Sequence, residues 1–178
     1  MTSLTAFTVL VLLVGLERVA ELVVSTRNAA WSLERGGVET GRGHYPVMVV
    51  LHTGLLAGAL AEAWLRRPHV PSGLAWSMLL LVLGSQALRW WCITTLGRRW
   101  NTRVIVVPGL APVAAGPYRW LRHPNYVAVV VEGFALPLVH AAWVTATVFT
   151  IANAVLLTVR IRTENAALAT LPGAASHA

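Results

Sequence analysis

Long apolar stretches alternate with short polar connections along the 178-residue chain. A helix needs roughly 20 apolar residues to cross a hydrocarbon core of about 30 Å. Three stretches meet this length, at residues 3–25, 46–65 and 73–96, and a fourth, residues 125–161, is long enough for two crossings. The pattern therefore predicts an all-α integral membrane bundle of about five transmembrane helices.

The fourth apolar stretch is interrupted near its middle by Pro137 and His140. A proline inside a helix removes a backbone hydrogen bond and clashes with the preceding turn. We therefore expect a tight helical hairpin here. Its first arm, residues 126–138, is short for a full crossing, so it should be tilted or shallow.

The chain shows no internal repeat and no second domain, so we expect one membrane domain over residues 1–178. Three N-terminal transmembrane helices fall within residues 1–96, and a loop followed by the helical hairpin falls within residues 97–168. The Ala-rich residues 169–178 should form a frayed tail. No cleavable signal peptide is expected, because no basic region precedes the apolar residues 4–16.

The composition also indicates a membrane protein. Hydrophobic residues make up 56% of the chain and charged residues 12%, whereas a soluble domain has about 25% charged residues. The net charge is +7, and all 14 basic residues are arginine. Such a balance in a soluble protein would suggest nucleic-acid binding. Here the arginines lie between apolar stretches, so membrane topology and anionic lipid explain them better, and no nucleic-acid partner is expected.

The arginines are divided unequally between the two sides of the predicted bundle. The connections 26–45 and 97–124 and the end of the last helix share one side, whereas the opposite side carries Arg66 and Arg67. The arginines of the richer side are Arg27, Arg35, Arg42, Arg98, Arg99, Arg103, Arg119, Arg122, Arg160 and Arg162. The positive-inside rule then predicts an N-terminus outside and a C-terminus in the cytoplasm, in a membrane that is expected to be the bacterial cytoplasmic membrane.

The segment Gly116–Tyr126, GPYRWLRHPNY, places two arginines, a histidine, an asparagine and two tyrosines directly before an apolar stretch. Pro124 suits a first helical turn, so a helix should begin near His123 or Pro124. Its free N–H groups would favour an anionic group such as a carboxylate. Polar groups so close to a bilayer core are costly without partners, which favours a binding site for a polar ligand. An interfacial anchor explains the segment equally well.

Charged residues also occur within and at the ends of the predicted spans. Arg160 and Glu164 close the last helix on one face, where they form a helical ion pair or converge with the 116–126 segment. Glu132 lies inside the apolar run VVVEGF, and either pairing with Arg89 or contact with a substrate would explain it. Glu17, Arg18 and Glu21 in the first helix either pair with another helix or line a substrate cavity.

Common signatures of soluble cofactor and metal enzymes do not occur in the sequence. There is no GxGxxG, Walker loop, HExxH or CxxC motif. The six histidines are scattered and the single cysteine, Cys92, lies in an apolar stretch, so neither a metal site nor a disulfide is expected.

Four short motifs in the C-terminal half follow one another at hairpin spacing. They are Leu96–Trp100 (LGRRW), Gly116–Tyr118 (GPY), Arg122–Tyr126 (RHPNY) and Arg160–Glu164 (RIRTE). Together they resemble the isoprenylcysteine carboxyl methyltransferase family over about residues 95–168. Phospholipid N-methyltransferases and membrane sterol reductases share a related RHxxY hairpin.

The N-terminal half looks like a bacterial branch of that family, through Glu17-Arg18, Ser25–Asn28 and His44–Pro46. Some members of this branch are similar to enzymes that O-methylate lipophilic polyketides such as alkylpyrones. Two features depart from the family pattern. Asn165 follows Glu164 where the family usually has a second glutamate, and the hairpin turn has Leu136–Leu138 (LPL) instead of the Asn-Pro of eukaryotic members. The acceptor therefore stays open.

The resemblance implies S-adenosylmethionine as cofactor, held by the last hairpin and the loop before it and not by a Rossmann domain. Carried over by motif, the cofactor-binding residues are Val113, Tyr118, His123, Pro124, Asn125, Tyr126 and Glu164. Arg160 would act on the substrate side, with Glu132 as a further candidate for substrate contact. A carboxylate acceptor, with a reference pKa of about 4, needs no base. A phenolic or enolic acceptor would lose its proton to His123, the nearest candidate base.

We therefore expect a membrane enzyme that methylates a carboxylate or hydroxyl oxygen of a lipophilic or prenylated acceptor entering laterally from the bilayer. Two alternatives remain at this point. One is an NADPH-dependent enzyme of the sterol-reductase type. The other is a non-catalytic membrane partner protein, for which Gly54 and Gly58 offer a weak small-residue helix face.

Overall fold

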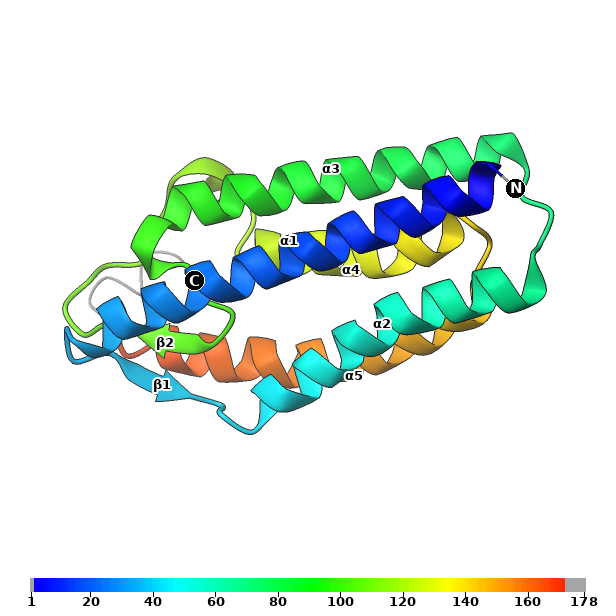
Figure 1. The fold of residues 1–178 in the computed structure, drawn as a ribbon. Helices are drawn as coiled ribbons and strands as arrows, with labels where there is room; N and C mark the ends of the chain where they lie inside the picture. The colour runs from blue at the N-terminus through cyan, green and yellow to red at the C-terminus, as the bar shows by residue number, and fades with distance from the viewer. Residues whose placement is uncertain (1, 172–178) are drawn as a thin grey trace.

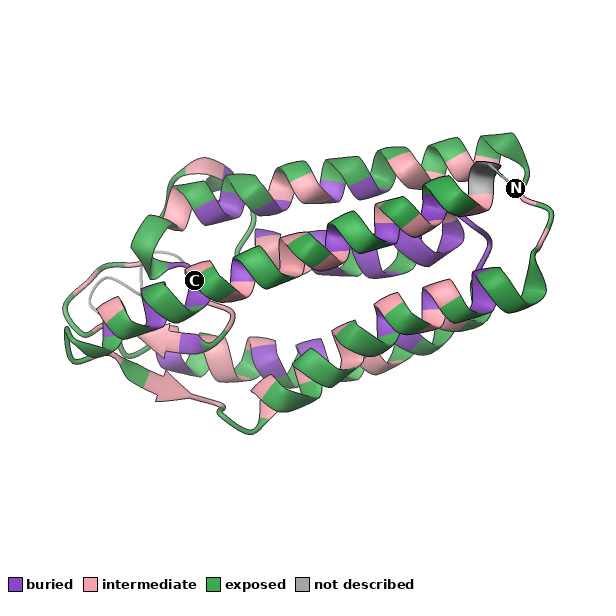
Figure 2. Ribbon diagram, in the orientation of Figure 1, coloured by how far each residue is buried: buried purple, intermediate pink, exposed green. Residues whose placement is uncertain are grey.

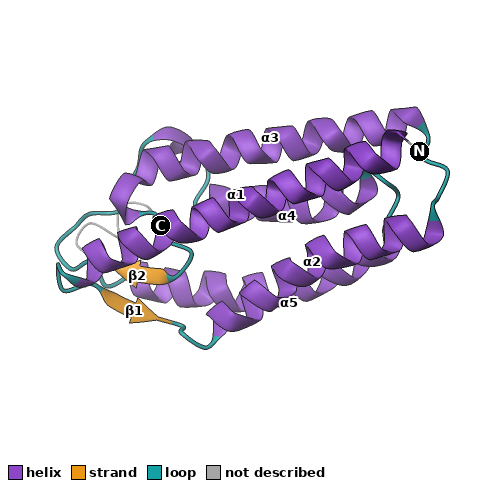
Figure 3. Ribbon diagram, in the orientation of Figure 1, coloured by secondary structure: helices purple, strands orange, loops and turns teal. Residues whose placement is uncertain are grey.

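The computed structural model of the chain describes residues 2–171, which form five long helices lying side by side (Figure 1). The helices are α1 (Thr2–Leu33), α2 (His44–Arg66), α3 (Ser72–Leu96), α4 (Pro124–Leu138) and α5 (Trp143–Leu168). Two 3-10 turns, η1 (Gly97–Arg99) and η2 (Gly116–Arg119), lie in the long connection before α4. Figure 3 shows that the described residues are mostly helical, with one small sheet. This confirms the predicted all-α bundle ending in a hairpin.

Three helices in the described part of the chain are long and apolar enough to cross a membrane, at His44–Arg66, Ser72–Arg99 and Trp143–Leu168. The helix α4 has 15 residues and is therefore about 22 Å long. It is shorter than the hydrocarbon core, as predicted for the first arm of the hairpin. The helix α1 has 32 residues, and its outward-facing positions between Val9 and Val23 are apolar and exposed.

The exposed surface of the bundle is rich in large apolar side chains, including leucines and valines of α1, α3 and α5. Figure 2 shows exposed residues along the outer faces of the helices. A continuous exposed apolar surface of this kind marks contact with a membrane. The apolar core lies at the end of the bundle where the N-terminus is seen (Figure 1). Its buried members are Phe7, Val11, Val14, Ala59, Ala63, Val82, Ala135 and Leu136.

The predicted hairpin joins α4 and α5 through a tight, buried turn. Pro137 lies in the last turn of α4, and its carbonyl accepts a hydrogen bond from the Ala142 N–H at 3.0 Å. Ala141 takes the left-handed conformation, with φ of 52°, which reverses the chain direction. The two arms then approach closely, because a Cβ atom at Gly133 would lie 2.0 Å from a ring carbon of Phe149. Only glycine leaves room for that ring against the α4 backbone.

One predicted boundary is wrong, because the first helix continues past its apolar stretch. The helix α1 extends beyond residue 25 to Leu33, whereas α5 ends at Leu168, the predicted end of the hairpin. In α1 the additional turns carry Asn28, whose Nδ2 donates hydrogen bonds to the Gly97 carbonyl at 3.1 Å and the Trp100 carbonyl at 2.8 Å. Contacts with the α3–α4 connection therefore hold these polar turns in helical form, which an apolar pattern alone could not show.

A two-stranded antiparallel sheet forms where the sequence predicted only loops. The strands β1 (Val38–Thr40) and β2 (Val104–Val106) pair with Val38 opposite Val106 and Thr40 opposite Val104. The sheet lies beside the last turns of α1, at the end of the bundle opposite the N-terminus (Figure 1). Each strand is only three residues long, so a local pattern could hardly identify it, and pairing depends on the two connections meeting in space.

The predicted tail, residues 169–178, is described only as far as Leu171. Residues 169–171 continue the last helix as a hydrogen-bonded turn, with the Ala169 N–H donating to the Asn165 carbonyl at 3.0 Å. The remaining part, residues 172–178, lies outside the described residues.

The start of α5 is capped by a glutamate from another helix. The Glu62 carboxylate of α2 accepts hydrogen bonds from the Val144 N–H at 3.1 Å, the Thr145 N–H at 2.8 Å and the Thr145 hydroxyl at 2.9 Å. The residue that precedes α5, Ala142, provides no side-chain cap. A carboxylate at a helix N-terminus satisfies free N–H groups and interacts favourably with the helix dipole. Glu62 thus ties α2 to the second arm of the hairpin.

Replacing Glu62 with alanine should therefore destabilise the bundle. We expect the free energy of unfolding to fall by about 1–2 kcal/mol, the usual effect of losing a helix cap. Thermal unfolding of the detergent-purified protein measures this, with Glu34→Ala as the control, since the Glu34 side chain is 73% exposed. Equal midpoints for the two variants would contradict the capping role.

Candidate active site

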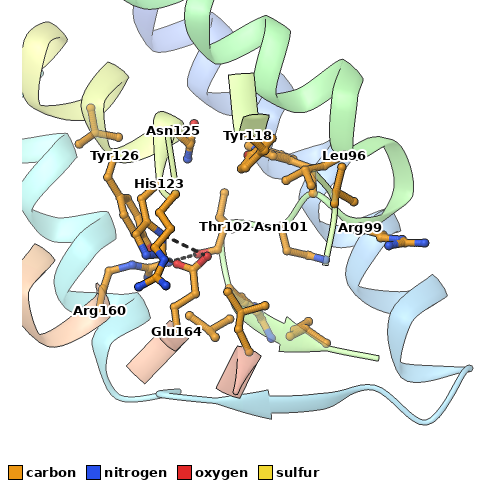
Figure 4. A pocket seen from close by; sticks show the side chains of 18 of the residues that line it. Leu96, Arg99, Asn101, Thr102, Tyr118, His123, Asn125, Tyr126, Arg160 and Glu164 are labelled. Atoms are coloured by element: carbon orange, nitrogen blue, oxygen red, sulfur yellow. Dashed lines mark hydrogen bonds and ion pairs between the residues drawn. The ribbon is translucent and has the colours of Figure 1, made fainter. Parts of the chain in front are cut away.

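A cavity of about 920 Å³ lies at the end of the bundle that carries the sheet, between the α3–α4 connection, the start of α4 and the end of α5 (Figure 4). Ligand sites for small molecules usually measure about 300–1,000 Å³, so this one is large. Nearly all predicted site residues line it: Val113, Tyr118, His123, Asn125, Tyr126, Arg160 and Glu164. Pro124, buried in the first turn of α4, and Glu132 are not lining residues.

The start of α4 and the end of α5 are joined at the cavity by a cluster around Glu164. The His123 Nδ1 lies 3.7 Å from the Glu164 Oε1, and the Tyr126 hydroxyl donates a hydrogen bond to the Glu164 Oε2. The other ring nitrogen of His123 bonds to the Asn165 Oδ1 at 3.0 Å. The rings of His123 and Tyr126 are stacked, with centroids 5.4 Å apart. The predicted convergence of the 116–126 segment with the end of the last helix is thus confirmed.

This cluster changes the ionisation of His123. The neighbouring Glu164 carboxylate raises the pKa of His123 above its ordinary value of 6.5 and outweighs burial, which acts in the opposite direction. The imidazole therefore stays protonated to higher pH than a free histidine. Burial raises the pKa of Tyr118 above its ordinary value of 10, so that hydroxyl is neutral and can act as a hydrogen-bond donor.

Arg160 approaches the same cluster from α5 with part of its hydrogen-bonding capacity unused. Its Nη2 donates to the Thr102 carbonyl at 2.9 Å, and its Cζ lies 5.9 Å from the centroid of the Tyr126 ring. The side chain is buried, and among the described residues its Nε has no hydrogen-bond partner. The Asn125 Oδ1 is also buried and makes no hydrogen bond within the described part of the chain. The site therefore offers both a cationic donor and a neutral acceptor to a ligand.

The loop after α3 supplies cavity residues that sequence reasoning missed. Asn101 and Thr102 line the cavity, and Figure 4 shows them across from His123 and Tyr126. Ser25 of α1 holds this loop, because its hydroxyl accepts from the Thr102 N–H at 3.0 Å and lies 2.7 Å from the Thr102 hydroxyl.

A signal for this support exists in the sequence of α1. Buried polar residues recur at helical spacing on one face of α1, a pattern that indicates a polar contact surface and not lipid contact. They are Glu21, Ser25, Asn28 and Ser32.

An ion-pair cluster lies deeper in the bundle, where α1, α3 and α4 meet. The Arg89 Nη2 lies 2.5 Å and the Arg18 Nη2 3.4 Å from the Glu132 Oε2. Glu21 accepts from the Arg18 Nη1 at 2.8 Å and lies 3.6 Å from the Arg89 Nε. The pairing of Glu132 with Arg89, one of the two explanations left open above, is confirmed, while a contact between Glu132 and substrate stays a prediction. Arg18, Glu21 and Arg89 line the inner end of the cavity.

Comparison with known proteins agrees with this geometry. The sequence model of the isoprenylcysteine carboxyl methyltransferase (ICMT) family matches residues 78–170, which include the RHPNY and RIRTE motifs. The chain belongs to the ICMT family. The chain is also 38% identical over 162 residues, 91% of its own length and 96% of the other protein, to the uncharacterized protein YpbQ of Bacillus subtilis. The predicted family and its bacterial affiliation are thus confirmed, and the protein is a member of a family of membrane methyltransferases.

A second relative matches over a shorter region. Over 59 residues, 33% of this chain and 27% of that protein, the ICMT-family chain is 41% identical to the protein-methionine-sulfoxide reductase heme-binding subunit MsrQ of Agrobacterium fabrum. So short a match carries no functional assignment. No solved structure matches the chain. Within the described residues, no group of three or more His, Cys, Asp or Glu side chains could hold a metal ion.

The raised pKa of His123 predicts how its contribution to stability depends on pH. A group whose pKa is higher in the folded state than in the unfolded state stabilises the fold when it is protonated. For a histidine, this stabilisation is complete below the unfolded-state pKa of about 6.5 and is lost as the pH rises through the folded-state pKa. The thermal midpoint of His123→Gln should therefore lie furthest below that of the wild type at about pH 6 and approach it at alkaline pH. His69→Gln, in an exposed loop, is the control. A difference that is constant with pH would show that the imidazolium is not involved.

Proposed function

We propose that this ICMT-family protein transfers a methyl group from S-adenosylmethionine to an oxygen atom of a lipophilic acceptor in the membrane. One observation carries the proposal. At one cavity, a carboxylate that is ion-paired with His123 and hydrogen-bonded by Tyr126 lies next to the buried Arg160, whose Nε makes no hydrogen bond within the described residues. The Glu164 carboxylate suits a cationic methyl donor such as S-adenosylmethionine. The Arg160 guanidinium suits an anionic methyl acceptor.

The residues around Glu164 fit the cofactor. Its carboxylate can bind an ammonium group, and the buried Asn125 Oδ1, which makes no hydrogen bond within the described residues, can accept one from a ligand. The start of α4 carries no side-chain cap, so the positive end of its helix dipole favours a carboxylate beside it. Tyr118 and Val113 would complete the walls. When bound, S-adenosylmethionine supplies an electrophilic methyl group on a sulfonium sulfur.

Arg160 would hold the acceptor. A guanidinium binds a carboxylate through charge-assisted hydrogen bonds and fixes its orientation. The protein's contribution to the rate is then alignment and exclusion of water. The raised pKa of His123 favours the imidazolium, which cannot take a proton from a phenol or enol. This supports a carboxylate as the methylated group, because a carboxylate needs no base.

The same proposal includes an orientation. The arginine-rich connections and the cavity lie at one end of the bundle, and Arg66 ends α2 at the other. By the positive-inside rule the cavity would face the cytoplasm, with the N-terminus outside. Cofactor would then enter from the cytoplasm. The acceptor, a prenylated or other lipophilic molecule, would enter from the bilayer beside the short helix α4.

Methyl transfer can be tested directly with the purified protein. Incubation with S-adenosylmethionine carrying a labelled methyl group, in the presence of a bacterial membrane lipid extract, should move label into the organic phase. Base-labile label would identify an ester, the product of carboxylate methylation. Consumption of NADPH without label transfer would favour the reductase alternative, and neither reaction would favour a non-catalytic partner protein.

The two sides of the cavity should respond differently to substitution. Arg160→Ala removes a charge-assisted hydrogen bond to the acceptor, so we expect turnover to fall roughly 10- to 100-fold with little change in cofactor affinity. Glu164→Gln should mainly weaken cofactor binding, measured by calorimetry without acceptor. Arg162→Ala is the matched control, because Arg162 is exposed on the same turn. Equal loss of turnover and cofactor affinity in Arg160→Ala would contradict its assigned side.

A further inference from the structure

The cavity continues past Arg160 to a polar inner end inside the bundle. Arg18 and Glu21 of α1, Arg89 of α3 and Asn153 of α5 line this inner end. Asn153 precedes Arg160 by seven residues on the same helix, which places it two turns, or about 10 Å, deeper. The cavity is thus long enough to hold an acceptor that reaches well beyond the site of methylation.

Several polar atoms at this inner end have unused hydrogen-bonding capacity. The Asn153 Oδ1, the Glu21 Oε1 and the Arg89 Nε are buried, and none makes a hydrogen bond within the described residues, although the last two face each other as an ion pair at 3.6 Å. Each of the three residues is at least nine-tenths buried, with exposed fractions of 2%, 4% and 4%. Buried polar groups of a native protein are normally satisfied. Unused donors and acceptors that line one cavity therefore point to a ligand that satisfies them.

The charge of the surrounding cluster restricts what that ligand group can be. Three carboxylates, of Glu17, Glu21 and Glu132, surround two guanidinium groups, of Arg18 and Arg89, through the ion pairs of this cluster. An added carboxylate would meet three acids, and an added ammonium would compete with both arginines for their partners. A neutral hydroxyl can donate to the Asn153 Oδ1, which makes no hydrogen bond within the described residues, without adding a charge to these ion pairs.

We propose that the inner end binds a neutral hydroxyl group at the far end of the acceptor. The preferred acceptor is then a lipophilic carboxylic acid that carries a hydroxyl about 10 Å from its carboxylate, the separation of Asn153 and Arg160 along α5. A plain hydrocarbon or prenyl tail would leave the inner polar atoms unsatisfied. This inference rests on the proposed function, since Arg160 must hold the carboxylate.

A pair of ligands that differ in one group tests the proposal. Binding of ω-hydroxydecanoic acid and of decanoic acid is measured on the detergent-purified protein by ligand-dependent thermal unfolding. The hydroxy acid should bind at least about tenfold more tightly, because a site built to hydrogen-bond a hydroxyl discriminates against an analogue that lacks it.

Substitutions then test whether the preference for the hydroxy acid arises at the inner end of the cavity. Asn153→Leu, similar in volume, should reduce the ratio of the two affinities to near one without weakening decanoic acid binding. Glu21→Gln should reduce the ratio by a smaller factor, which tests the inner end by a second route. Thr150→Val is the matched control. Thr150 lies one turn from Asn153, its buried hydroxyl oxygen also makes no hydrogen bond within the described residues, and it does not line the cavity.

Equal affinity for the two acids in the wild type would overturn the inference, as would failure of both acids to raise the unfolding midpoint. A ratio that Asn153→Leu leaves unchanged would overturn it too, provided that the variant unfolds cooperatively without ligand. The proposed methyl transfer is judged separately, by label in the membrane lipid extract. That label would appear even if the far end of the acceptor were a plain hydrocarbon.

Discussion

The contact of Glu164 with His123 and Tyr126 determines whether this protein has a site at all. It joins the first turns of α4 to the last turns of α5, two segments separated by the whole hairpin. Arg160, one turn before Glu164, lies beside the Tyr126 ring and donates to the Thr102 carbonyl. The hairpin turn, with its close approach at Gly133, makes this contact possible by bringing the arms together.

Several polar and charged side chains of the membrane-spanning helices lie inside the bundle. Apolar side chains cover the outside of the bundle, so the polar residues of the spans can be accommodated only inside. Two such groups are the cluster at Glu164 and the deeper ion pairs of Glu132 with Arg18 and Arg89. Both groups border the same cavity. The buried polar network and the ligand site are therefore one continuous feature, enclosed by an apolar core on one side and a small sheet on the other.

The long N-terminal helix contributes more than a membrane span. Its polar face supports the loop after α3 through Ser25 and Asn28, and that loop in turn places Thr102 against Arg160. Substitutions in the first third of the chain can thus alter a site whose recognisable motifs all lie in the last half. The family motifs therefore do not include all the residues that form the cavity, because α1 and the loop after α3 also contribute to it.

The sequence alone determined the membrane class, the five helices, the hairpin at Pro137 and the site motifs, because apolar length, proline and short motifs are local properties. It could not determine the small sheet, the extra turns of α1, or the loop residues Asn101 and Thr102 in the cavity. These depend on contacts between residues far apart in the chain, such as Ser25 with Thr102. Glu132 shows the same limit, since its sequence allowed either a ligand or an ion pair. The tertiary structure supplied the ion pair by placing Arg89 against it.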